Sequence, residues 1–261
     1  MVSQQSAVTE RFKPRQVGII TTTRADYGIY QPLLRALRDR GCRVTLYAGG
    51  THPAPEFGQT IKQIEADGWG PVHRIEHHRP GDRDVDIAAS CGRAVSAFAA
   101  ALGEARPDLL FVLGDRFEML AAGLAAVLLG IPLAHLHGGD VTEGANDDQF
   151  RHALTKLCHL HFAAIDEHAE RIRAMGEEPW RVHAVGALAV DALREFKPEP
   201  LAVIAAEAGL EPRRATLVLA YHPQTLSAEA PVDAFERVAS GIEGFDGNVL
   251  VVGTNADAGH A

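Results

Sequence analysis

Two consecutive apolar runs near the middle of the chain each end in side chains that can exchange protons. The first run is followed by Asp115 and Arg116, and the second by His137 and Asp140. An apolar helical stretch separates the runs, so they form a βαβ unit whose strand ends lie at one edge of a parallel sheet. Ligands of open parallel sheets bind at that edge. The pattern predicts a catalytic cleft, and one that takes a phosphorylated ligand.

The position of Asp115 at a strand end fits two roles. Beside a cleft, its carboxylate can act as a base or hold a sugar hydroxyl, while Arg116 grips a phosphate. As a helix cap it would only stabilise the start of the helix expected at 117–129. Capping is compatible with function, and we favour the functional role.

The segment His135-Leu136-His137-Gly138-Gly139 also has competing interpretations. Two histidines at this spacing point to one face of a strand, as in many metal-dependent hydrolases. A histidine in a strand buried on both faces is more often a core residue bonded to backbone, which fits His135. We favour a ligand-facing His137 and a glycine pair that lets the backbone approach a ligand. We expect no metal, because no further ligands with metal spacing follow.

A helix expected at 147–157 follows the same loop. Asp147 and Arg151 are four residues apart, as are Asp148 and His152, so each pair shares a helix face. These groups are either an N-cap with surface ion pairs or part of the cleft. Their position directly after the glycine loop favours the cleft.

Two further turns carry candidate ligand contacts. At 21–28, the N-terminus of a helix and Arg24 can bind a phosphate; the alternative is a plain helix cap by Thr23 or Asp26. This turn has no Gly-x-Gly-x-x-Gly, which disfavours a nicotinamide cofactor. His222 follows a later strand, where it either protonates a leaving phosphate or lies in a surface loop.

Short apolar runs alternate with helical stretches along the chain. Strands are expected at 16–21, 43–48, 72–75, 109–113, 131–136, 159–164 and 181–185. Continuous apolar strands of this kind are typical of a parallel sheet covered by helices on both faces. The first helix carries Leu33 and Leu34, and we expect Pro32 near its start because proline breaks a helix interior.

The pattern restarts after Gly186 and a polar segment at 194–200. We divide the chain into a polar leader at 1–15, a Rossmann-like domain at 16–186 and the first part of a second such domain at 187–261. The second part holds two expected strands and two expected helices, too few for a doubly wound sheet. We therefore expect the sequence to be a truncated chain.

Composition narrows the class of protein. The net charge of −9 argues against a nucleic-acid partner, whereas a local arginine is enough for a phosphate. The first residues are charged and no apolar run is long enough to cross a bilayer, so we expect a cytoplasmic protein without a membrane partner. Three cysteines without paired spacing predict buried thiols in a reducing compartment.

Taken together, the motifs resemble those of the hydrolysing UDP-N-acetylglucosamine 2-epimerases, which belong to the nucleotide-sugar 2-epimerase family of sialic and legionaminic acid biosynthesis. The resemblance runs in order from about residue 16 to the end of the chain. It rests on T-R-A-D-Y-G at 23–28, T-H-x-x-P-E-F-G at 51–58, G-D-R-F-E at 114–118, H-x-H-G-G-D-V-T-E-G at 135–144, D-D-x-x-R-H-A-x-T-K at 147–156, Y-H-P at 221–223 and N-A-D at 255–257.

The resemblance implies an α/β fold with two Rossmann-like domains in a GT-B arrangement, the second incomplete in this chain. It implies that UDP-N-acetylglucosamine loses UDP by elimination across C1–C2, and that water then adds to the 2-acetamidoglucal with inversion at C2, giving N-acetylmannosamine. No cofactor is needed. The expected partners are the UDP-sugar, UDP and further copies of the chain in a dimer or tetramer.

By position, the resemblance makes Asp115, His137, Asp147 and His222 the expected catalytic residues. His137 stands where some relatives have a glutamate, a role that Asp140 or Glu143 could fill. The residues expected to contact the substrate are Arg24, Asp26, Tyr27, Arg116, Gly138, Gly139, Asp140, Glu143, Arg151, His152, Asn255 and Asp257.

Three alternatives to this function remain at the sequence level. The same chemistry could act on a UDP-2,4-diacetamido-2,4,6-trideoxyhexose, since one acetamido group changes only a few pocket contacts. A GT-B glycosyltransferase would instead move the sugar to an acceptor. A non-catalytic nucleotide-sugar-binding fragment is the third, because the family's uridine-diphosphate loops lie beyond residue 261; the chain as given is expected to bind weakly or to be inactive.

Overall fold

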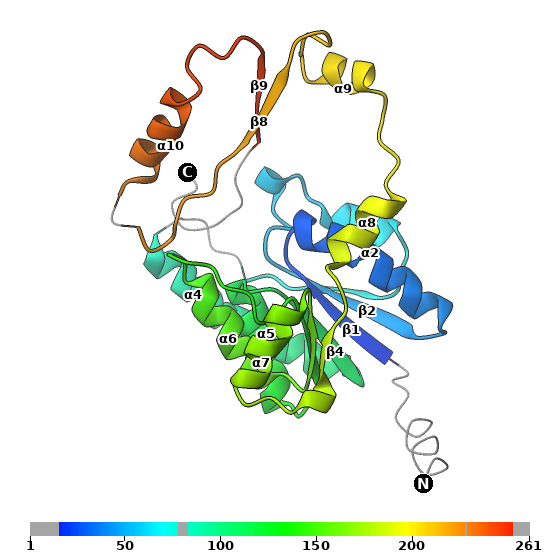
Figure 1. Ribbon diagram of the computed structural model, residues 1–261. Coiled ribbons are helices and arrows are strands. Elements are labelled where there is room, and N and C mark those ends of the chain that lie inside the picture. Colours follow the sequence, from blue (N-terminus) through cyan, green and yellow to red (C-terminus); the bar gives the residue numbers. More distant parts are fainter. Residues whose placement is uncertain (1–15, 78–82, 228, 253–261) are drawn as a thin grey trace.

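A seven-stranded parallel sheet forms the centre of the molecule (Figure 1). The computed structural model describes residues 16–77, 83–227 and 229–252. The strand order is β3-β2-β1-β4-β5-β6-β7, and every neighbouring pair is parallel. The strands are β1 (Gln16–Thr21), β2 (Arg43–Ala48), β3 (Val72–Arg74), β4 (Leu109–Leu113), β5 (Leu133–Leu136), β6 (Leu160–Ala163) and β7 (Val182–Ala184). This confirms the expected α/β fold.

Helices cover both faces of the sheet, because alternate side chains of each strand point to opposite sides. Ile19 and Phe111 join one buried cluster with residues of α2, while Ile20 and Val112 join the other with residues of α4 and α5. The helices of this unit are α2 (Arg24–Asp39), α3 (Ile61–Ala66), α4 (Asp84–Glu104), α5 (Phe117–Leu128), α6 (Asp147–Leu157) and α7 (Asp166–Ala174), with the short turns η1 (Pro55–Phe57) and η2 (Pro179–Arg181).

The strand order reverses between β1 and β4. From β1 the chain proceeds outward through β2 and β3, then crosses back through α4 to begin β4 on the other side of β1. The loops that follow β1 and β4 therefore run in opposite directions and leave a crevice between them. Such a switch point is where doubly wound sheets bind their ligands.

A smaller unit follows the sheet. It holds β8 (Thr216–Ala220) and β9 (Asn248–Val252), which pair in parallel, with α9 (Leu201–Glu207) and α10 (Pro231–Ser240). Before it lies α8 (Leu188–Glu195), which packs against α2 in Figure 1 and forms an ion pair between Glu195 and Arg35. The sequence pattern predicts no helix at 188–195, because these residues lie between Gly186 and the polar segment at 194–200 and are assigned to a domain boundary.

One expectation for α2 is wrong. Pro32 lies well inside the helix, which begins at Arg24, and not near its start. The helix begins early because Thr23 and Asp26 form a reciprocal capping box. Proline removes the N–H that would bond to the carbonyl of Gly28, and this glycine is exposed, so water can reach that carbonyl.

Helix α4 has the length and the apolar composition of a membrane-spanning segment, which the sequence analysis did not expect. A core helix passes the same test, and here Ala94, Phe98 and Leu102 of α4 are fully buried against the sheet and α5.

All three cysteines are free: Cys158 is buried, whereas Cys42 and Cys91 are half-buried.

Candidate active site

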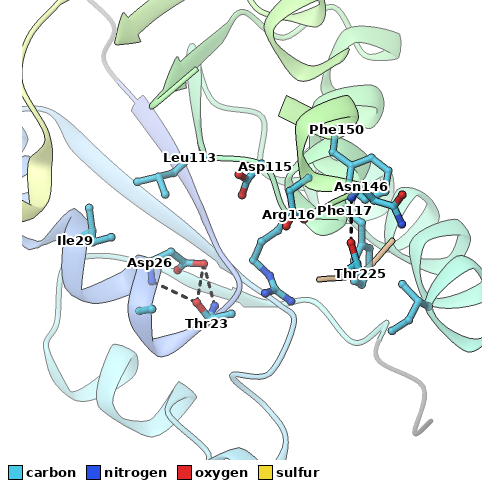
Figure 2. Close-up of a pocket in the computed structure, with 14 residues that line it drawn as sticks. Thr23, Asp26, Ile29, Leu113, Asp115, Arg116, Phe117, Asn146, Phe150 and Thr225 are labelled. Atoms are coloured by element: carbon cyan, nitrogen blue, oxygen red, sulfur yellow. Dashed lines mark hydrogen bonds between the residues drawn. The ribbon is translucent and has the colours of Figure 1, made fainter. Parts of the chain in front are cut away.

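A cavity of about 300 Å³ lies at the switch point between β1 and β4 (Figure 2). Its floor and walls come from the turns that follow these two strands and from the start of α6, with one residue of the smaller unit. The lining residues are Thr23, Ala25, Asp26, Ile29, Ile87, Leu113, Gly114, Asp115, Arg116, Phe117, Asn146, Asp147, Phe150 and Thr225. Three carboxylates from different elements, those of Asp26, Asp115 and Asp147, thus line one cavity.

Asp115 follows a turn that is fixed from the neighbouring strand. Gly114 adopts a left-handed backbone (φ +72°), which glycine accepts at low cost. His135 of β5 is fully buried, and its Nε2 bonds to the carbonyl oxygen of Gly114 at 2.8 Å while Nδ1 lies 3.2 Å from the hydroxyl of Thr155. Burial is the main reason why the pKa of His135 falls to about 3. A neutral His135 therefore donates to Gly114, as a core histidine bonded to backbone.

Asp115 is also held by Arg151 of α6. The Nη2 atom of Arg151 donates to Oδ2 of Asp115 and, at 2.7 Å, to the hydroxyl of Thr142. Nη1 lies 3.7 Å from Oδ1 of Asp148, whose same oxygen accepts the backbone N–H of Thr142 at 3.1 Å. The side chain of Arg151 is 5% exposed, whereas that of Asp115 is 28% exposed and faces the cavity.

Arg116 lines the cavity, and Glu118 fixes the direction of its side chain. Its Nε and Nη2 atoms lie 3.1 and 3.2 Å from the two carboxylate oxygens of Glu118, a buried residue in the first turn of α5. A planar guanidinium held through two nitrogens keeps a fixed direction. This arrangement would let the Arg116 guanidinium bind a negatively charged ligand group at one side of the cavity.

Asp26 also lines the cavity, and local donors bond to both of its carboxylate oxygens. Its carboxylate accepts hydrogen bonds from the hydroxyls of Thr21 and Thr22 and from the backbone N–H groups of Thr22 and Thr23. Burial raises the pKa of Asp26, and the bonds from Thr21 and Thr22 act against that rise. Asp26 thus shapes the turn that leads from β1 into the cavity.

His52, a buried histidine, bonds to the turn between β1 and α2. Nε2 of His52 lies 2.9 Å from the Thr21 hydroxyl, and Nδ1 lies 2.7 Å from the hydroxyl of Thr60. Because Thr21 donates to Asp26, the Thr21 oxygen must accept from His52, which makes Nε2 the protonated nitrogen. Burial lowers the pKa of His52 to about 4, so the ring is neutral at pH 7.

His137 and its glycine loop lie outside the cavity lining. His137 has a left-handed backbone (φ +61°), an uncommon state for a residue with a side chain, and burial lowers its pKa. A Cβ on Gly138 would lie 2.7 Å from His135, and one on Gly139 would lie 2.3 Å from a backbone oxygen of α7. In the described chain the glycines therefore allow close packing against protein. Asp140 contacts His168 at 3.2 Å.

The remaining candidates fall into three groups. Tyr27 is buried and donates to Asp67 at 2.6 Å, and His152 lies 3.7 Å from Asp148. Arg24 and Glu143 are exposed beside the cavity turns. Asn255 and Asp257 lie outside the described residues.

His222 belongs to a second cavity, of about 430 Å³, in the smaller unit. Tyr221, Gln224 and Arg237 line it with His222, and Arg237 forms an ion pair with Glu229. The two cavities are adjacent along the chain, because Gln224 lines the second and Thr225 lines the first.

The smaller unit contacts the rim of the first cavity at this point. The hydroxyl of Thr225 accepts the N–H of Asn146 at 3.0 Å, drawn in Figure 2, and the N–H of Leu226 donates to the carbonyl of Gly144 at 3.1 Å. Sequence reasoning missed Thr225 and Asn146. Residue type gives no signal for either, and only the packing of the two units brings them together.

No three His, Cys, Asp or Glu side chains are grouped as a metal site within residues 16–77, 83–227 and 229–252. We therefore expect catalysis to rest on the side chains described above, and turnover to survive an excess of EDTA. Initial rates with and without the chelator test this. A rate that is lost in EDTA and restored by Mg²⁺ would revive a metal-assisted reaction.

The chain is similar in sequence to known proteins. A family model described as UDP-N-acetylglucosamine 2-epimerase matches residues 35–261. A UDP-N,N'-diacetylbacillosamine 2-epimerase (hydrolyzing) of Legionella pneumophila is 30% identical over 246 residues, which cover 94% of this chain and 65% of that protein. A GDP/UDP-N,N'-diacetylbacillosamine 2-epimerase (hydrolyzing) of Campylobacter jejuni is 32% identical over 216 residues, covering 82% and 56%.

The fold is shared with solved structures as well. The crystal structure of a Methanocaldococcus jannaschii UDP-GlcNAc 2-epimerase in complex with UDP-GlcNAc and UDP superimposes with a TM-score of 0.75 at 19% identity, covering 90% of this chain and 65% of that one. This likeness confirms the expected α/β fold of the GT-B type. The chain spans somewhat less than two thirds of the length of these relatives.

Proposed function

This chain belongs to the UDP-N-acetylglucosamine 2-epimerase family, and we propose that the protein inverts C2 of a UDP-2-acetamido sugar and releases UDP. The observation that carries the proposal is the pair Asp115 and Asp147, two carboxylates on different elements that face one cavity at the switch point. Inversion at a carbon that bears a hydrogen needs one group to remove a proton and a donor on the other face. Two carboxylates on different elements can divide these two roles.

The proposed reaction has two steps. One carboxylate takes the C2 proton while the C1–O bond breaks and its electron pair leaves with the diphosphate, giving a 2-acetamidoglucal. Water then adds its oxygen to C1, and a proton reaches C2 from the opposite face, giving the 2-acetamidomannose sugar. The C2–H is a weak acid, so its removal depends on charge stabilisation at the departing diphosphate.

Cationic groups are available for that diphosphate. Arg116 points into the cavity from its Glu118 support, and Arg24 is exposed at the N-terminus of α2, where backbone N–H groups also favour an anion. We assign His222, in the adjacent cavity of the smaller unit, to proton transfer to the leaving phosphate. His137 lies outside the cavity. We therefore propose that His137, Asp140, Glu143 and His152 support the site and are not the groups that exchange a proton with C2.

UDP-N-acetylglucosamine is the proposed substrate. The named activities of the Legionella and Campylobacter relatives favour the UDP-2,4-diacetamido-2,4,6-trideoxyhexose as the second candidate. We also propose that the protein is cytoplasmic, because three free cysteines suit a reducing compartment. The proposal includes a homo-oligomeric state as well.

Turnover in deuterated water tests the function. The protein is incubated with each UDP-sugar and no acceptor, and products are followed by NMR. We expect UDP release and one deuterium at C2 of the free manno sugar. Deuterium at C2 in a sugar still joined to UDP indicates epimerisation without hydrolysis. UDP release only with an added acceptor indicates a glycosyltransferase, and binding without turnover indicates a binding module.

A further inference from the structure

Arg151 is a buried charged group next to the cavity, with 4% of its surface exposed, and it does not line the cavity itself. Its guanidinium is turned toward protein. Nη2 bonds to both Asp115 and Thr142, and Nη1 lies near Asp148. One side chain therefore connects the end of β4, the loop before α6 and the first turn of α6.

The chemistry of these contacts calls for arginine. A guanidinium is planar and presents several N–H groups in fixed directions, so one nitrogen can serve Asp115 and Thr142 together. A lysine ammonium would offer the charge without the fixed geometry. A buried ion pair is in general no more stable than apolar side chains of similar volume. Stability alone therefore does not account for a buried arginine here, whereas a fixed direction for Asp115 does.

Asp115 needs such support because its local backbone gives little. It follows a glycine, and its side chain is partly exposed to the cavity. His135 fixes the turn through the Gly114 carbonyl but does not touch the Asp115 carboxylate. In the described chain, the bond from Arg151 is the side-chain contact that the structure gives to that carboxylate.

The loop at the other end of the contact also meets the smaller unit. Thr142 begins the segment whose Gly144 and Asn146 bond to Leu226 and Thr225. Arg151 thus connects Asp115 to the 142–146 loop, which bonds to the smaller unit at the rim of the cavity.

We propose that Arg151 is a positioning residue, which holds the Asp115 carboxylate and the 142–146 loop in one arrangement relative to the bound sugar. The inference rests on the proposed function of Asp115. It differs from the expectation that Arg151 contacts the substrate: a substrate ligand would change KM, whereas a positioning residue changes kcat through Asp115. Misplacing a reacting group by about 1 Å costs on the order of 10²-fold in rate.

The test compares Arg151→Met with Arg171→Met. Arg171 is the matched control, because it also holds the 137–146 loop, through the carbonyl of Gly139, but contacts no cavity carboxylate among the described residues. We expect Arg151→Met to lower kcat by about 10²-fold with KM within threefold, and Arg171→Met to keep kcat within threefold. Arg151→Lys should recover part of the loss.

A double variant separates positioning from general damage. If Arg151 acts through Asp115, then Asp115→Asn combined with Arg151→Met has the same kcat as Asp115→Asn alone. Losses that multiply, or a kcat of Arg151→Met no lower than that of Arg171→Met, overturn the inference. Thr142→Val covers the case in which Arg151→Met fails to fold: we expect a three- to tenfold lower kcat, about the worth of one hydrogen bond, and an unchanged kcat overturns the inference.

Turnover of the wild-type protein shows whether the proposed function or only the inference about Arg151 has failed. If wild type releases no UDP and exchanges no C2 hydrogen, the proposed function falls and the inference falls with it. If wild type turns over and Arg151→Met matches its control, only the inference is lost.

Discussion

Replacing Asp115 with asparagine is expected to lower turnover by about 10²–10⁴-fold, the usual contribution of a positioned acid or base. The amide keeps the shape of the side chain and cannot accept the C2 proton. Arg151 loses its ionised partner but retains Thr142 and the nearby Asp148, so the fold should persist. KM should change little, because most of the binding energy of a UDP-sugar comes from uridine and diphosphate contacts elsewhere.

Asp108→Asn is the matched control for this substitution. It changes an exposed aspartate just before β4, at the opposite edge of the sheet from the cavity. Asp147→Asn should resemble Asp115→Asn, since Asp147 faces the same cavity. If these aspartates only stabilise helix starts, the folded variants will turn over normally and lose about 0.5–2 kcal/mol of stability instead. Rates measured on folded protein, checked by circular dichroism, distinguish the two results.

A second large effect is expected on stability as the pH falls. His52 and His135 are fully buried, and burial lowers their pKa values from 6.5 to about 4 and about 3. In the unfolded chain both protonate near pH 6.5, so the unfolded state binds more protons below that pH. Their stabilising contribution is complete above pH 6.5 and is lost as pH falls toward the folded pKa values.

At pH 5, each of the two histidines is expected to lower the unfolding free energy by about 2 kcal/mol relative to pH 7, because pH 5 lies 1.5 pH units below the unfolded pKa of 6.5 and each pH unit contributes about 1.36 kcal/mol. The raised pKa of Asp26 acts in the opposite direction. Urea unfolding of wild type and of His135→Gln at both pH values isolates the histidine contribution. The variant should show a pH dependence smaller by about 2 kcal/mol. An equal dependence in both proteins would show that His135 is not the group that titrates.

The sheet and its reactive edge were predictable because their signals are local. The apolar runs of β4 and β5 are short, continuous and followed by Asp115 and by a histidine and glycine loop. The strands that lie next to β4 and β5 in the sheet can be predicted because crossovers between parallel strands are right-handed. Local reasoning failed where two local rules competed: the rule against proline in a helix moved the expected start of α2, whereas the capping box of Thr23 decided it.

Other parts of the site depend on contacts between distant segments. Helical spacing predicted that Arg151 shares a face with Asp147 in the cleft and contacts the substrate, but α6 packs so that its guanidinium meets Asp115, 36 residues away in sequence. Thr225 reaches the cavity from the smaller unit, 79 residues from the Asn146 N–H that it accepts. Helix spacing and residue type carry no information about such pairs.

The adjacency of Gln224 and Thr225 has a consequence for ligand design. These two residues are neighbours in the chain, yet one lines the cavity that holds His222 and the other lines the cavity that holds Asp115. Two small molecules that each fill one cavity weakly could be joined by a linker that passes over this dipeptide. After the first half binds, the second meets its cavity at an effective concentration in the millimolar range for a short flexible linker. Avidity of this kind would come from the spacing of the two cavities and would need no new contact in either of them.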